Sequence, residues 1–335
     1  MPRSVAVFGA AGFTGALAAR LLFRHPSFEL KTVTARSDVG RRLDELYPYH
    51  RVPLVLEELD LDRQGDLDAA VVAYPHGAAA PLVKGLLLRG VKVVDLSADF
   101  RLRDPATYQL WYREHEAPEL LDRAVYGLPE LYREELRGAA LVANPGCYPT
   151  AALLALAPLA GHGLIEDVVI DAKSGVSGAG RAATDKTHFV TVDENVVAYG
   201  VPGHRHTPEI EQELAVLDPA HPDVPITFIP HLLPLDQGEL VSCYVTGDGA
   251  LADADLDQLY AEAYADEPFV EVVASPPGVR DVRETNFCRV SVHRDERTGR
   301  VVVFGAIDNL WKGAASQAVQ NLNLMFGLPE GEGIS

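Results

Sequence analysis

The chain has 335 residues, and its 29 Lys and Arg against 48 Asp and Glu give a net charge of −19. A chain this acidic is a poor electrostatic partner for nucleic acid or an anionic membrane surface, and no apolar run reaches the roughly 18 residues of a membrane helix. Hydrophobic residues make up 47% of the chain, which is ordinary for globular proteins, so the length predicts about two domains. The N-terminus enters a strand without a charged and then apolar leader, so we expect a cytoplasmic protein.

The first part of the chain alternates between short apolar strands and helices. This alternation is typical of an α/β fold with a doubly wound parallel sheet of Rossmann type. The predicted strands are 4–8, 28–35, 69–74, 91–96 and 140–143, and the predicted helices are 15–24 and 81–89.

From about residue 168 the strands become longer and richer in β-branched residues. This pattern predicts an α+β domain with a mixed sheet and helices on one side, and the boundary between the domains near Cys147. The predicted strands are 168–172, 226–230, 240–246, 286–293 and 301–307, with helices at 208–217, 253–264 and 312–326.

A glycine loop connects the first strand to the first helix. Gly9, Gly12 and Gly15 are spaced G-x-x-G-x-x-G, which allows a tight turn and lets backbone N–H groups approach a pyrophosphate at the helix start. The alternative is a tight turn that binds nothing. Arg36 and Ser37 follow the second strand, where an Arg accommodates a 2′-phosphate, so we expect NADP(H) rather than NAD. The alternative is that Arg36 is only a surface charge.

A cysteine precedes an Ala- and Leu-rich helix in the segment N-P-G-C-Y-P-T, residues 144–150. Pro149 suits a first helical position, which puts Cys147 just before the cap, at the positive end of the helix dipole. A thiol there is biased toward the nucleophilic thiolate. Cys243 and Cys288 fall inside predicted strands and are expected in the core. Three distant cysteines argue against a disulfide framework.

Two histidines flank an arginine ahead of a predicted helix. Thr207 is expected to cap this helix and Pro208 to start it, so His204, Arg205 and His206 lie on the approaching loop. A histidine there can serve as the base for the thiol. A cysteine, a histidine and a dinucleotide loop in one chain point to redox chemistry through a thioester.

Two other chemistries have less support. His-x-His could chelate zinc, but no third ligand presents itself, so no metal site is predicted. Ser177 does not lie in a G-x-S-x-G elbow because position 179 is Ala, so a serine hydrolase is unsupported.

Over nearly its whole length the chain resembles the N-acetyl-gamma-glutamyl-phosphate reductases of the aspartate-semialdehyde dehydrogenase-like group. Position 316 is Ser where the family usually has Gly, and position 11 is Ala where Ser is common. Both are small residues, so neither departure affects the expected chemistry. The resemblance rests on residues 9–15, 95–101, 126–130, 144–150, 174–181, 204–210, 230–234 and 308–321.

The resemblance implies reduction of an acyl phosphate by NADPH through a thioester on Cys147, with His206 preferred to His204 as the base. It implies a fold like that of glyceraldehyde-3-phosphate and aspartate-semialdehyde dehydrogenases. The NADP-binding domain would span 1–146, the catalytic and oligomerisation domain 147–311, and the helix 312–327 would return to the first domain. Ser97, Arg101, His204 and Arg205 would bind substrate anions. The cofactor would contact Gly9, Gly12, Phe13, Thr14, Gly15, Arg36, Ser37, Ser177, Gly178 and Asn309.

The expected substrate is N-acetyl-gamma-glutamyl phosphate, and the expected partner a second copy of the chain, in a homodimer or homotetramer. The nearest alternative is the lysine-pathway relative that reduces an aminoadipyl phosphate on an acidic carrier protein. A chain at −19 should repel such a carrier. Aspartate-semialdehyde dehydrogenase fits the histidine loop less well. A non-catalytic NADP sensor would not need Cys147 or the histidines.

Overall fold

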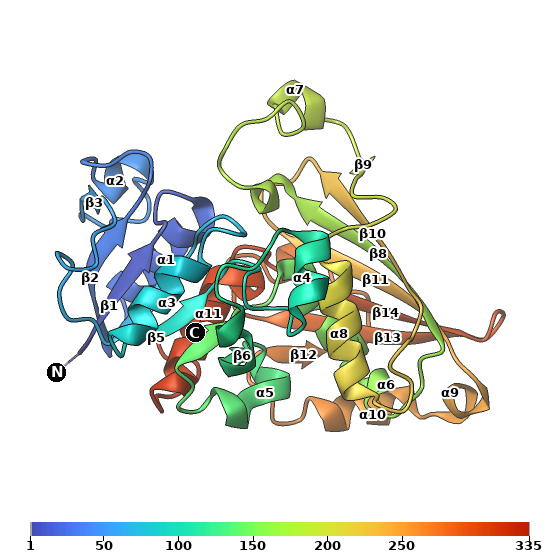
Figure 1. The fold of residues 1–335 in the computed structure, drawn as a ribbon. Coiled ribbons are helices and arrows are strands. Elements are labelled where there is room, and N and C mark those ends of the chain that lie inside the picture. Colours follow the sequence, from blue (N-terminus) through green and yellow to red (C-terminus); the bar gives the residue numbers. More distant parts are fainter. Residues whose placement is uncertain (1, 335) are drawn as a thin grey trace. The chain divides into compact units, whose positions relative to one another are not determined.

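The computed structural model describes residues 2–334, which divide into two compact units. Unit 1 combines the residues up to Gly146 with those from Ala314 onward, and unit 2 runs from Cys147 to Gly313. Unit 1 therefore contains both the N-terminal segment, blue in Figure 1, and the C-terminal segment, red in Figure 1.

Unit 1 contains a seven-stranded sheet in the order β3-β2-β1-β4-β5-β7-β6, with every neighbouring pair parallel. This confirms the predicted Rossmann-type sheet. Its central strands are Ala- and Val-rich and fully buried, as expected for a parallel sheet covered on both faces. The strands are β1 (Arg3–Phe8), β2 (Phe28–Thr34), β3 (Leu56–Glu57), β4 (Ala69–Val72), β5 (Lys92–Asp95), β6 (Ala124–Tyr126) and β7 (Leu141–Ala143).

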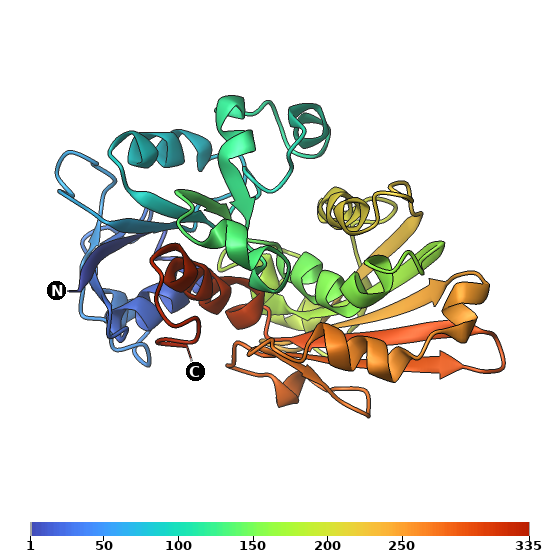
Figure 2. The same ribbon diagram turned by 90° about the horizontal axis from the view of Figure 1, so that it is seen from below.

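Helices and short helical turns connect these strands, and one helix comes from the far end of the chain. Helix α11 packs against α1, α5 and β5 within unit 1, and Figure 2 shows it in red beside them. The side chains of Gln317 and Asn321 donate to the Gly127 carbonyl at 2.8 and 2.9 Å, so buried amides hold this helix. The helices are α1 (Phe13–Phe23), α2 (Leu43–Leu46), α3 (Ala80–Leu88), α4 (Pro105–Trp111), η1 (Pro118–Arg123), α5 (Pro129–Leu136) and α11 (Ser316–Met325).

Unit 2 contains a mixed sheet in the order β12-β13-β14-β11-β8-β10-β9, which confirms the second predicted fold. The pairs β8–β10 and β12–β13 are parallel, and the other pairs are antiparallel. The strands are β8 (Asp167–Gly175), β9 (Val197–Ala198), β10 (Ile226–Leu233), β11 (Glu239–Thr246), β12 (Val270–Val272), β13 (Cys288–Asp295) and β14 (Arg300–Ile307).

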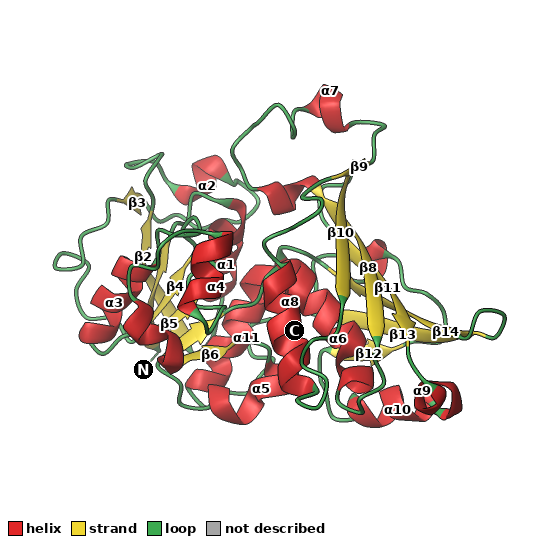
Figure 3. Cartoon of the chain, turned by 45° about the vertical axis from the view of Figure 1, so that its right-hand side comes forward, coloured by secondary structure: helices red, strands yellow, loops and turns green. Residues whose placement is uncertain are grey.

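Three helices of unit 2 lie together on one face of this sheet (Figure 3). The central one, α6 (Cys147–Ala160), contacts β11, β13 and β14 and is flanked by α8 (Thr207–Leu217) and α10 (Leu256–Ala263). The remaining helical segments of unit 2 are η2 (Val176–Ala179), α7 (Phe189–Val192), α9 (Gly249–Asp253) and η3 (Val279–Asp281).

Several predicted helix boundaries were wrong. Helix α8 begins at Thr207 after His206, so Thr207 is not its cap. The helix predicted at 253–264 is split, because the Asp255 side chain accepts the Gln258 N–H and starts a new helix. The last helix opens with a π-helical turn, Trp311–Ala315, in which the Gly313 N–H reaches back to the Asp308 carbonyl at 2.9 Å.

The glycine loop between β1 and α1 contains two glycines that the local packing requires. Gly9 has a φ of +95°, and a Cβ atom there would lie 2.4 Å from the Ala73 carbonyl oxygen. A Cβ on Gly15 would lie 2.3 Å from the Gly9 carbonyl oxygen. Gly12 differs, since its φ is −78° and an added Cβ would meet only the Gly9 oxygen, at 3.7 Å. Packing therefore explains Gly9 and Gly15 but not Gly12.

We expect Gly15→Ala to lower the free energy of unfolding by about 1–3 kcal/mol, because backbone must move to admit the methyl group. Gly12→Ala should leave stability unchanged or raise it slightly, because alanine adopts this φ without strain. Urea unfolding of the two variants side by side measures the difference. Equal destabilisation of both would contradict this account of the loop.

Candidate active site

A cavity of about 540 Å³ lies within unit 2, at the start of α6. Its walls come from the end of β8, the turn η2, the loop that carries α7, and the segment leading into α8. Cys147, His204, Arg205 and His206 all line it, so the structure brings together four residues that the sequence singled out.

Cys147 is the first residue of α6, and the prediction that it precedes the helix was wrong. Pro149 is the third helical residue, where it still needs no hydrogen bond from its nitrogen. The first turn of α6 contains no acidic residue, so the positive helix end favours the Cys147 thiolate. Cys147 is partly exposed, whereas Cys243 and Cys288 are fully buried, which confirms these two as core residues.

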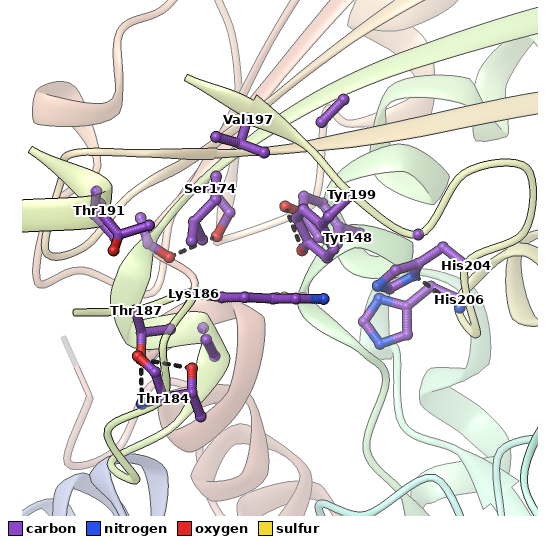
Figure 4. A pocket seen from close by; sticks show the side chains of 18 of the residues that line it. Tyr148, Ser174, Thr184, Lys186, Thr187, Thr191, Val197, Tyr199, His204 and His206 are labelled. Atoms are coloured by element: carbon purple, nitrogen blue, oxygen red, sulfur yellow. Dashed lines mark hydrogen bonds between the residues drawn. The ribbon is translucent and has the colours of Figure 1, made fainter. Parts of the chain in front are cut away.

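Two histidines lie edge to face beside this cysteine. The rings of His204 and His206 are 4.8 Å apart, and each lies 5.9 Å from the Tyr148 ring (Figure 4). Burial, with a smaller effect of Arg205, lowers the pKa of His204 to about 4, so this ring is neutral at pH 7. Its Nδ1 accepts the His206 backbone N–H at 3.1 Å. His204 therefore carries no positive charge at pH 7, and its Nδ1 is already used as an acceptor.

Charged groups around the cavity are all cationic. Lys186 and Arg205 line it, and no Asp or Glu is among its lining residues within the described chain. Figure 4 shows the Lys186 side chain extended across the cavity, with its ammonium group toward the side where the histidines lie. Lys186 carries no signal in the sequence, because it lies in a polar loop about forty residues from Cys147 with no motif of its own.

A buried carboxyl group lies behind Cys147. Glu239, the first residue of β11, is fully buried, and neither of its carboxyl oxygens has a hydrogen-bond partner of good geometry among residues 2–334. Burial raises its pKa to about 8, while the nearby Cys147 thiol and Ser174 hydroxyl act in the opposite direction. Glu239 carries no signal in the sequence either, because the segment D-Q-G-E, residues 236–239, is typical of a polar turn.

Ser177, Gly178 and Asn309 lie together in unit 2. The Asn309 side chain donates to the Ser177 hydroxyl at 3.0 Å and accepts the Gly238 N–H at 2.8 Å. The Ser177 hydroxyl donates to the Asp236 carbonyl at 2.6 Å. Gly178 lines the cavity with Cys147, and Asn309 holds the neighbouring backbone in place.

Ser97 and Arg101 belong to unit 1, after the carboxyl end of β5. The Ser97 hydroxyl donates to Asp95 at 2.6 Å and accepts the Asp99 N–H at 3.0 Å. Arg101 donates through Nε to the Asn144 carbonyl at 2.8 Å and through Nη2 to the Leu96 carbonyl at 2.9 Å. Both side chains are buried, so these contacts brace the strand ends. Their predicted contact with substrate stays a prediction.

Asp95 sits at the centre of this polar group and is fully buried. Burial, and then the neighbouring Asp99, raise the pKa of Asp95 to about 7, against the opposing donors of Ser97 and the charge of Arg101. The carboxylate of Asp99 accepts the N–H groups of Gly77, Ala79 and Ala80, and so anchors the start of α3.

The predicted cofactor residues of unit 1 gather at the carboxyl ends of β1 and β2. Gly12 precedes α1, and no side chain caps the N-terminus of this helix. The Tyr47 hydroxyl donates to the Ala11 carbonyl at 2.8 Å and holds the loop. Arg36 and Ser37 are exposed after β2, with the Arg36 guanidinium 4.9 Å from the centre of the Tyr74 ring.

Between residues 2 and 334, no group of three or more His, Cys, Asp or Glu side chains is arranged to hold a metal ion. Over the same residues, none of the helices combines the length and apolarity needed to traverse a bilayer.

Family comparisons cover most of the chain. A model described as "Semialdehyde dehydrogenase, NAD binding domain" matches residues 4–139, and one described as "Semialdehyde dehydrogenase, dimerisation domain" matches residues 147–309. An N-acetyl-gamma-glutamyl-phosphate reductase of Desulforudis audaxviator is 53% identical over 341 residues, covering 98% of this chain and 97% of the relative. The reductase of Pelotomaculum thermopropionicum is 49% identical over 343 residues, covering 100% and 98%.

Solved structures share the fold at low identity. Aspartate semialdehyde dehydrogenase II of Vibrio cholerae, complexed with ASA, superposes with a TM-score of 0.72 at 19% identity, covering 98% of this chain and 99% of that one. The Candida albicans aspartate semialdehyde dehydrogenase with NADP has a TM-score of 0.69 at 14% identity, covering 97% and 99%.

Proposed function

This chain belongs to the semialdehyde dehydrogenase family, among its N-acetyl-gamma-glutamyl-phosphate reductases, and we propose that it reduces N-acetyl-gamma-glutamyl phosphate through a thioester on Cys147. The observation that carries this proposal is the Cys147 thiol at the N-terminus of α6, in a cavity whose only charged lining residues within the described chain are cationic. An acyl phosphate is an anion, and its carbonyl carbon is the target that a thiolate attacks.

Three residues that line the cavity take part in the proposed reaction: Cys147, Arg205 and His206. The Cys147 sulfur attacks the acyl carbon, the bond to the phosphate oxygen breaks, and Arg205 binds the anionic group that departs. His206 moves the proton at the reacting oxygen, whereas the His204 ring is neutral at pH 7 and its Nδ1 accepts the His206 backbone N–H. The product is N-acetyl-glutamate 5-semialdehyde, released when the Cys147 sulfur leaves the reduced carbon.

The reverse reaction tests the substrate. With N-acetyl-glutamate semialdehyde, phosphate and NADP⁺, the protein should produce reduced cofactor, measured by its absorbance, and should act far less on the aminoadipate analogue. Cys147→Ser should lower this rate by at least about 10³-fold, because the hydroxyl is a much weaker nucleophile than the thiolate. Preference for the aminoadipate analogue would instead support the lysine-pathway alternative.

We propose NADPH as the cofactor, bound by the glycine loop of unit 1. When bound, it supplies the hydride that reduces the thioester. The residues present fit a dinucleotide: α1 begins without a side-chain cap, and Gly12 is a glycine that internal packing does not explain. A pyrophosphate lying against Gly12, Phe13 and Thr14 would explain both features. Ser177, Gly178 and Asn309 are proposed at the nicotinamide end.

Arg36→Ala should raise the KM for NADPH about 10-fold or more and leave binding of NADH unchanged, because the exposed guanidinium would lose its contact with a 2′-phosphate. Arg41→Ala is the matched control, since Arg41 pairs with Asp38 at 3.2 Å and Glu45 at 3.7 Å on the same surface. Fluorescence titration with both cofactors measures the effect. Equal losses for NADPH and NADH would show that Arg36 does not recognise the phosphate.

We further propose Lys186 as a second anion-binding residue for the substrate. Lys186→Ala should raise the substrate KM about 10-fold with little change in kcat, since a bound anion would lose one charged hydrogen bond. Lys186→Arg keeps the charge and should restore most of the affinity. Identical KM values for the wild type, Lys186→Ala and Lys186→Arg would remove Lys186 from the substrate site.

For assembly, we propose a homodimer formed through the face of the unit 2 sheet opposite α6. On that face four large side chains of β11 and β14 are only partly buried: Leu240, Tyr244, Val302 and Phe304. A dimerisation-domain model matches this unit. The three free cysteines fit a reducing compartment such as the cytoplasm.

A further inference from the structure

We propose that Glu239 is the acceptor of the Cys147 thiol proton, so that this cysteine and this carboxyl group form a coupled acid–base pair at the foot of α6. The inference rests on the proposed thioester mechanism and deepens it, because it names the group that activates the nucleophile. Glu239 comes from β11 and Cys147 from α6, which pack on each other in unit 2.

The burial of Glu239 is the first observation. Its side chain is fully buried, yet neither oxygen accepts a hydrogen bond of good geometry from the described residues. A buried carboxylate without partners is costly, and stability alone would favour an apolar residue or a paired one. Buried carboxylates usually accept hydrogen bonds. Glu213, which is also fully buried, accepts one from the Gln212 side-chain amide at 2.7 Å. Glu239 therefore needs a different explanation.

The identity of its neighbours is the second observation. The two donors that influence the carboxyl group are the Cys147 thiol and the hydroxyl of Ser174, the residue opposite Glu239 on β8. No cation is among the groups that shift its titration, and Asp308 opposes its ionisation. Tyr148 and Tyr199 also interact with it: burial raises the pKa of both phenols, and the charge of Glu239 adds to that rise. These surroundings favour proton exchange with the thiol over a fixed ion pair.

Burial brings the pKa of Glu239 to about 8, close to that of an ordinary thiol. Two groups with matched proton affinities can share one proton, and the pair then titrates in two coupled steps. The helix end at Cys147 favours the state with a thiolate and a neutral acid. A carboxylate beside the thiolate disfavours the second proton loss.

Before the attack, the S–H bond breaks and the proton moves to a Glu239 oxygen. The Cys147 thiolate then forms the S–C bond. The electron pair of the breaking C–O bond leaves with the phosphate. When the reduced carbon later releases the sulfur, the thiolate takes the proton back from Glu239. The carboxylate is then regenerated, so the pair completes the cycle without net change.

The test is alkylation of Cys147 by iodoacetamide across pH 5 to 10, followed by mass spectrometry of the Cys147 peptide. No substrate is used, so a wrong substrate assignment would not affect the result. In the wild type, the rate should rise in two steps. In Glu239→Gln it should rise in one step that is complete at lower pH than the second wild-type step, because no carboxylate opposes the thiolate. Glu213→Gln, a buried control, should keep the two-step profile.

Turnover and stability complete the test. Glu239→Gln should lower kcat/KM about 100-fold, because the thiol proton has lost its acceptor, while the melting temperature stays unchanged or rises. Glu239→Leu should likewise melt no lower than the wild type. A one-step profile shared by the wild type and Glu239→Gln would overturn the proposal. So would a fall in melting temperature with an unaltered alkylation profile, which would mark Glu239 as a structural residue.

Discussion

The apolar character of α6 is the constraint on which the catalytic unit depends. Every residue of this helix from Tyr148 to Ala160 is buried, so it must lie between the sheet and the helices beside it. Its first residue then falls at the edge of the core, where the helix dipole meets the cavity. Hydrophobic burial of α6 thus fixes the position of the Cys147 sulfur at the cavity, and the helix dipole favours its thiolate form.

Acidic and basic residues are concentrated in different parts of unit 2. Between residues 206 and 279 there are fifteen acidic residues and no Lys or Arg, yet the cavity in the same unit is lined by Lys186 and Arg205. The net charge of −19 therefore says little about the site. Screening by solvent isolates the surface carboxylates from the cavity, whereas the Glu239 carboxyl group near Cys147 is buried and is not screened.

Much of the fold and the centre of the site could be predicted from the sequence, because they rest on local signals. Alternating strands and helices indicated the first sheet, and Pro and Gly around Cys147 indicated a fixed helix start. Strands of two or three residues, such as β3 and β6, carry no measurable periodicity and were missed. Glu239 and Lys186 were missed for another reason: tertiary packing alone brings them to Cys147, and no spacing in the chain records that packing.

The return of α11 to unit 1 has a consequence for the newly made chain. Unit 2 is continuous, so its core can close once residue 313 has left the ribosome. Unit 1 begins to emerge first. Until α11 is made, however, the Gly127 carbonyl lacks its two amide donors, and the surfaces of α1 and α5 that α11 covers remain exposed to water. Unit 1 is therefore the first unit to be started and the last to be completed. A chain cut after residue 315 would keep all of unit 2 but leave unit 1 without α11.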